Sequence, residues 1–238
     1  MHVYWINIYN DENKYRRDHM EHTLTDVSNT MIKAYTPYTL PKLIKERSIA
    51  STMTKLEEYA CTASHLKAMQ QALYDNQEYA IIVEDDIIIP RNVDFEKLID
   101  TAPNDWEILQ LCTNNTKMLL NNFKTYKNDK ELWAPWTFMS WCTTGYIIKA
   151  DVMRKLVQIH MYEENLLDVS MITLTKAVAD IVIYQNKKTY TLTYPCFEAL
   201  NISSNIHPEH LSMHVESSTL TKNILDHYDF PKEISRIP

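Results

Sequence analysis

The 238-residue sequence predicts an α/β fold: a mostly parallel, doubly wound sheet with helices on both faces. Residues 54–76 repeat apolar side chains at helical spacing, which predicts a long amphipathic helix. A continuous apolar run at residues 79–83 follows directly and is typical of a parallel strand buried on both faces. Helical and strand patterns continue to alternate along the chain, which favours α/β over other classes.

The other elements follow from the same patterns, taken in order. Residues 3–9 are rich in β-branched and aromatic side chains and predict a first strand, after which Asn10 and Asp11 indicate a turn and residues 13–24 a helix. Further strands are predicted at residues 31–35, 106–111, 145–149, 181–184 and 190–194. Further helices are predicted at residues 94–101, 151–161 and 166–177.

The composition excludes several classes of protein. Lys and Arg number 24 against 31 Asp and Glu, and this net charge of -7 disfavours a broad nucleic-acid-binding surface. The four cysteines form no CxxC pair, and no apolar run approaches the ~20 residues that span a bilayer. Without a signal-peptide pattern, we expect a soluble, cytoplasmic protein with no integral membrane segment. A single glycine, Gly145, rules out glycine-rich phosphate loops.

Three adjacent carboxylates, Glu84, Asp85 and Asp86, follow the apolar run at residues 79–83 and precede another one. Ligands of open α/β sheets bind beyond the carboxyl ends of the strands, where these side chains emerge. Two like charges about 4 Å apart repel by roughly 1 kcal/mol in water and ~4 kcal/mol near a protein surface, and a cation removes that penalty. We therefore predict a site for Mn²⁺ or Mg²⁺ and a diphosphate, with Asp86 as a direct ligand and Glu84 or Asp85 as its partner. The alternative is an ordinary acidic surface turn.

Six segments, taken in order, resemble glycosyltransferase family 25, which contains lipopolysaccharide-type and collagen galactosyltransferase-like enzymes. They are WINIY (5–9) with Arg16 and Arg17 downstream, EYACTASHLKA (58–68), YAIIVEDD (79–86), WEILQL (106–111), GYIIKAD (145–151) and YTLTYPCF (190–197). The resemblance implies a GT-A fold, a nucleoside-diphosphate sugar as donor, a divalent metal on the acidic motif and inverting transfer to a glycan acceptor. The sequence departs from the family at Ala60, where glycine is frequent, and residues 113–144 match nothing recognisable.

No repeat or linker divides the chain, so we expect one glycosyltransferase domain over residues 1–238. Residues 1–112 would hold the nucleotide and the metal, and residues 113–238 would face the acceptor. Two other functions stay open: a nucleotidyl- or phosphotransferase that uses the same carboxylates, and a non-catalytic glycan-binding relative. The sequence does not predict an oligomeric state.

We call Glu84, Asp85 and Asp86 the acidic step. The nucleotide is expected near four further residues. Asn7 ends the first strand and Arg17 begins the following helix, where its guanidinium could bind the diphosphate in place of a glycine loop. Ser64 and His65 are adjacent on the long helix, so they diverge and cannot form a nucleophile–base pair. By resemblance they line the donor site. The alternatives are a solvated arginine and a buried structural histidine.

An inverting transfer needs a carboxylate as general base, and the candidates are Asp180, in ADIVIY, and Asp168. The resemblance favours Asp180, and either residue could instead be an ordinary turn or helix-end carboxylate. His207, in SSNIH (203–207), is the expected late histidine ligand of the metal. A separate zinc cluster of His207, His210 and His214 is disfavoured because no cysteine or acid accompanies it.

Aromatic residues crowd the segment before the lone glycine and could stack on a sugar or simply form core. They are Tyr126, Trp133, Trp136, Phe138, Trp141 and Tyr146. Gly145 itself would allow a ligand to approach the backbone closely or the chain to adopt a positive φ angle.

Overall fold

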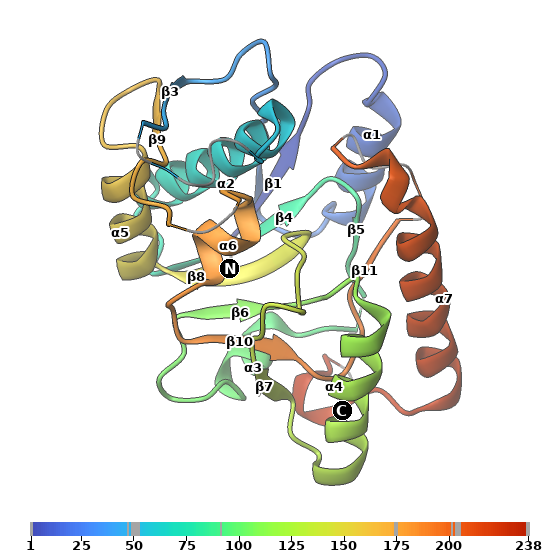
Figure 1. Cartoon of the computed structure of the whole chain (residues 1–238). Coiled ribbons are helices and arrows are strands. Elements are labelled where there is room, and N and C mark those ends of the chain that lie inside the picture. Colours follow the sequence, from blue (N-terminus) through green and yellow to red (C-terminus); the bar gives the residue numbers. More distant parts are fainter. Residues whose placement is uncertain are drawn as a thin grey trace. The chain divides into compact units, whose positions relative to one another are not determined.

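The computed structural model describes residues 2–46, 48, 53–90, 92–173, 176–200, 202 and 206–236. The chain forms two compact units. The first unit comprises His2–Asp85 and Ile148–Lys187, and the second comprises Asp86–Ile147 and Lys188–Pro238. Helices and strands alternate along the chain in both (Figure 1), which confirms the predicted α/β class. The expectation of a single functional domain stays a prediction.

The sheet of the first unit has β1 (Val3–Asn7) between β2 (Asn29–Lys33) and β4 (Tyr79–Glu84). Both pairings of β1 are parallel, and helix α1 (Lys14–Thr23) makes the crossover from β1 to β2. Every residue of β1 is buried, so both faces of this strand are covered. The apolar run of β4 is therefore a buried parallel strand, as predicted.

Helix α2 (Leu56–Tyr74) confirms the long helix expected over residues 54–76. It packs against all three strands of this sheet and against α5 (Ala150–His160) and α6 (Ala179–Tyr184). Its first turn is fixed by Glu58, whose Oε2 accepts a hydrogen bond from the Lys55 amide at 2.7 Å. These contacts make α2 the helix that positions side chains over the carboxyl end of β4.

Two predicted elements of the first unit are wrong. Residues 181–184 form the end of helix α6 instead of a strand, because their apolar side chains pack against α2, and a short apolar run fits either structure. Residues 166–177 are not a helix: Leu166–Asp168 is strand β9, which pairs in parallel with β3 (Lys42–Ile44). That partner is distant in sequence, so local periodicity could not reveal it. Residues 174 and 175 lie outside the described residues.

The second unit contains a mixed sheet. Strand β10 (Thr189–Leu192) pairs in parallel with β6 (Ile108–Gln110) and antiparallel with β7 (Trp133–Pro135). A separate antiparallel pair joins β5 (Ile87–Ile88) to β11 (Glu198–Ala199). Strand β8 (Gly145–Lys149) has the predicted bounds, and the division between the units falls within it.

The helices of the second unit are α3 (Phe95–Asp100), α4 (Thr116–Asp129) and α7 (Leu211–His227), with short 3-10 turns at Pro208–His210 and Lys232–Ile234. Helix α4 contacts α7, and α7 contacts β11. Helix α4 was not predicted from the sequence. Among the described residues, no helix is both long and apolar enough to cross a membrane.

Asparagine performs turns that glycine often makes elsewhere. Asn76, Asn165 and Asn186 adopt φ angles of 55°, 58° and 59°, which asparagine tolerates better than most residues. Gly145 has no positive φ; Cys142, three residues earlier, has a φ of 141°. The positive φ considered for the only glycine is therefore absent there.

Candidate active site

The acidic step lies at the carboxyl end of buried strand β4. Glu84 is the last residue of β4, and Asp85 and Asp86 form the turn before β5. Asp85 is 5% exposed and Asp86 is 6% exposed. Two carboxylates this deeply buried do not form an ordinary acidic surface turn, because burial of a charge needs specific compensation.

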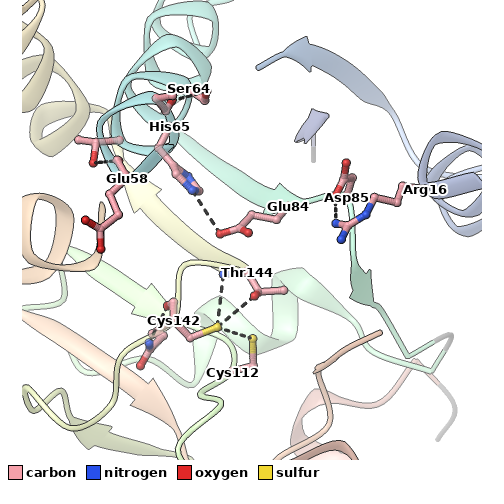
Figure 2. A network of polar contacts seen from close by, with 12 residues as sticks. Arg16, Glu58, Ser64, His65, Glu84, Asp85, Cys112, Cys142 and Thr144 are labelled. Carbon is pink, nitrogen blue, oxygen red and sulfur yellow. Dashed lines mark hydrogen bonds and ion pairs between the residues drawn. The ribbon is translucent and has the colours of Figure 1, made fainter. Parts of the chain in front are cut away.

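Asp85 is held by two buried side chains. Arg16 Nη1 donates to its Oδ1 at 2.6 Å, as Figure 2 shows, and Asn7 Nδ2 donates to its Oδ2 at 2.5 Å. Burial raises the pKa of Asp85 above its ordinary value, although Arg16 and Asn7 act in the opposite direction. Both carboxylate oxygens are thus engaged inside the protein. The contacts of Asn7 and Asp85 with each other fix the turn, and their expected role at the nucleotide stays a prediction.

The arginine that reaches this cluster is Arg16, whereas the arginine predicted at the site was its neighbour Arg17. Arg16 is 3% exposed and lies on the same face of α1 as the buried side chains of Met20 and Leu24. Arg17 points elsewhere: its Nη1 donates to the Asn10 carbonyl at 2.6 Å, and its guanidinium lies 4.6 Å from the centre of the Tyr9 ring. The spacing of residues 16, 20 and 24 was the signal that could have identified Arg16.

His65 and Ser64, which are adjacent on α2, contact different parts of the protein. His65 is 1% exposed, and its ring points to Glu84, with 3.4 Å between Nε2 and Oε1 (Figure 2). Ser64 Oγ donates to the Ala60 carbonyl at 2.7 Å and accepts from the Tyr35 amide at 2.8 Å. Ser64 therefore ties α2 to the segment after β2, while His65 reaches the acidic step.

The two candidate bases differ in their surroundings. Asp168 ends β9, where its carboxylate accepts hydrogen bonds from the Ser170 amide at 2.9 Å and from the Tyr162 hydroxyl at 3.3 Å. Burial works to raise the pKa of Asp168, but these hydrogen bonds outweigh it and hold the pKa below the ordinary value. A carboxylate with a lowered pKa is a poor proton acceptor. Asp180 is half-buried in the first turn of α6, and its role as the base stays a prediction.

In the second unit, the backbone carbonyl of Asp86 accepts from the Leu200 amide at 2.7 Å, which joins the acidic turn to the end of β11. His207 follows shortly after, with Nδ1 at 3.1 Å from Glu209 Oε1 and its ring stacked on His210 at 4.6 Å. The expectation that no acid accompanies these histidines is therefore wrong, because Glu209 lies between them. Residues 203–205 of the predicted SSNIH segment lie outside the described residues.

The aromatic segment divides into core and surface. Trp133 and Tyr146 are buried, whereas Phe138 is exposed and lies 6.2 Å from the half-buried Trp136 ring. Gln110 braces the loop that follows: its Nε2 donates to the Cys142 carbonyl at 2.9 Å and to the Ser140 carbonyl. Tyr126 and Trp141 are half-buried, as Trp136 is. Trp136 and Phe138 form an aromatic pair with an exposed member, of the kind that stacks on sugars.

Comparison with solved structures gives distant likenesses. A crystal structure of A197 from STIV is 8% identical, covers 83% of each chain and has a TM-score of 0.44. A crystal structure of a glycosyltransferase involved in the glycosylation of the major capsid of PBCV-1 is 10% identical and has a TM-score of 0.45, covering 93% of this chain and 98% of the other. No curated protein matches this sequence.

The family comparison is decisive. Residues 1–173 match the family described as "Glycosyltransferase family 25 (LPS biosynthesis protein)". The match covers well over half of the 238 residues and contains β1, α2 and the acidic step. This chain therefore belongs to glycosyltransferase family 25.

Proposed function

We propose that this protein transfers a sugar from a nucleoside-diphosphate sugar to a hydroxyl of a glycan or glycoconjugate, with inversion at the anomeric carbon and with Mn²⁺ or Mg²⁺. The observation that carries the proposal is the buried acidic step at the carboxyl end of β4, in a chain of a glycosyltransferase family. Ligand sites of open α/β sheets lie beyond this end of the strands.

The residues present suit a hard divalent ion. Asp86 offers carboxylate oxygens and His207 an imidazole nitrogen, a donor set that Mn²⁺ accepts. Asp85 is engaged by Arg16 and Asn7, so we assign the metal to Asp86 and His207, with Glu84 as the further predicted ligand. When bound, the ion would neutralise charge on the departing diphosphate.

The side chains would perform the remaining chemistry. The Asp180 carboxylate takes the proton from the acceptor hydroxyl as that oxygen forms a bond to the anomeric carbon. The bond from the anomeric carbon to the diphosphate oxygen breaks, and the nucleoside diphosphate leaves with the electron pair. Arg17, in the absence of a glycine loop, is the proposed cation for the diphosphate, for which its guanidinium would leave the Asn10 carbonyl.

A transfer assay tests the proposal. Purified protein with Mn²⁺ is incubated with a panel of nucleotide sugars and glycan acceptors, and products are analysed by mass spectrometry and by NMR of the anomeric proton. We expect a new glycoside of inverted configuration and one equivalent of nucleoside diphosphate. Pyrophosphate or phosphate released from a nucleoside triphosphate would indicate a nucleotidyl- or phosphotransferase instead. Glycan binding without any turnover of a donor would indicate a non-catalytic relative.

A further inference from the structure

A second set of metal-ligand atoms lies entirely within the first unit. Cys61 and His65 are four residues apart on one face of α2, and Glu84 ends β4. One ligand atom from each of these three side chains lies within 4.8 Å of the other two. The Nε2 atom of His65 is 3.4 Å from Oε1 of Glu84, and Figure 2 shows the ring turned to the carboxylate.

The separation between His65 Nε2 and Glu84 Oε1 is close to that of two ligands in a zinc site. Bonds of about 2.0–2.3 Å in tetrahedral geometry place two ligands of one zinc ion roughly 3.3–3.8 Å apart. The longest separation here is at most 4.8 Å, so small side-chain rotations would bring all three atoms onto one ion. A thiolate, an imidazole and a carboxylate are all ligands that zinc uses, and three protein ligands leave a fourth position open.

The backbone that carries these ligands is well anchored. Glu58 holds the first turn of α2 through the Lys55 amide, and its Oε1 lies 3.2 Å from Lys176 Nζ. Ser64, between the two helical ligands, ties α2 to the Tyr35 amide. Glu84 is paired with Ile6 of β1. The His65 side chain is buried, while 28% exposure of the Glu84 side chain leaves a route for an ion.

We propose that Cys61, His65 and Glu84 form a binding site for a zinc-class transition metal ion. The site goes beyond the proposed function. Its thiolate separates it chemically from a hard-ion site of oxygen ligands, because soft sulfur ligands select zinc-class ions over Mn²⁺ and Mg²⁺. Zinc bound here would hold Glu84 against α2. Glu84 would then be a ligand of zinc and no longer of the ion of the sugar donor, which Asp86 and His207 would hold.

Cobalt substitution tests the site directly. The metal-free full-length protein is titrated with Co²⁺, and the absorption spectrum is followed. We expect one equivalent to give the visible bands of tetrahedral cobalt and an ultraviolet band of thiolate-to-cobalt charge transfer, both abolished when Zn²⁺ is added. Cys61→Ser should abolish the charge-transfer band, and His65→Asn and Glu84→Gln should weaken binding by at least about tenfold.

Two controls make the result specific. Cys112→Ser removes a buried thiol outside the cluster and should leave the spectrum unchanged. His210→Asn alters the group formed by His207, Glu209 and His210, which contains no thiol, and should also leave it unchanged. Circular dichroism establishes that each variant is folded. A charge-transfer band that persists in folded Cys61→Ser protein, or wild-type protein that binds neither ion, would overturn the proposal. The readout needs no nucleotide or sugar, so it is independent of the transfer assay.

Discussion

Replacing Arg16 by alanine is expected to lower the free energy of unfolding by about 3–5 kcal/mol at neutral pH. The substitution leaves Asp85 buried without its guanidinium partner, and a buried carboxylate that has lost its cation is strongly destabilising. Urea unfolding followed by circular dichroism measures the change. Arg17→Ala is the matched control. Arg17 is half-buried and contacts Tyr9 and the Asn10 carbonyl but no buried carboxylate that the structure describes, so its removal should have an effect below about 1 kcal/mol.

The destabilisation of the Arg16→Ala protein should shrink as the pH falls. Burial already raises the pKa of Asp85 in the folded protein, and without Arg16 one of the influences that lower this pKa is gone. A carboxyl whose pKa is raised on folding favours the folded state once protonated, so the penalty is full above its folded pKa and fades below it. Adding Asp85→Asn should remove this pH dependence. An equal penalty for Arg16→Ala and Arg17→Ala, independent of pH, would contradict the assignment.

Asp180→Asn should reduce kcat for sugar transfer by about 10²–10⁴-fold, the usual contribution of a general base. Asparagine keeps the size of the side chain but cannot accept the proton of the acceptor hydroxyl. Initial rates at saturating donor measure the change, and binding of the nucleoside diphosphate should stay close to that of the wild type.

Asp168→Asn is the comparator, because Asp168 is the other candidate base. Its hydrogen bonds to Ser170 and Tyr162 and its lowered pKa predict a rate within a few-fold of the wild type. If Asp168→Asn abolished transfer while Asp180→Asn did not, the role of base would pass to Asp168.

The elements predicted correctly are those with a strong local pattern. Helix α2 repeats apolar side chains at helical spacing and strand β4 is a continuous apolar run, so the sequence of each segment was sufficient to predict it. Strands β3 and β9 are three residues long and are stabilised by each other across more than 120 positions, which no local pattern encodes. The prediction of a strand at residues 181–184 was wrong for a related reason. Packing of this apolar run on α2 makes it helical, and the packing cannot be read from the local sequence.

The candidate site shows the same contrast between features set by local sequence and features set by long-range contacts. The position of the acidic step followed from one apolar run and three adjacent carboxylates. The partners of Glu84 and Asp85 did not follow from the local sequence, because these contacts depend on which side chains of α2 and α1 face the end of β4. Arg16 could have been found from the helical spacing it shares with Met20 and Leu24. The contact between His65 and Glu84 could not be predicted in this way, because the two residues lie on different elements that only the folded structure brings together.

The most direct test of the central claim is calorimetric titration of the wild-type protein and of Asp86→Ala with UDP and GDP, each with and without Mn²⁺. We predict that at least one nucleotide binds the wild type, that binding requires Mn²⁺, and that Asp86→Ala loses it, while Asp26→Ala, an exposed carboxylate of the first unit, retains it. Nucleotide binding that is independent of Mn²⁺, or that is equal in the wild type and Asp86→Ala, would contradict a metal-bridged diphosphate at the end of β4.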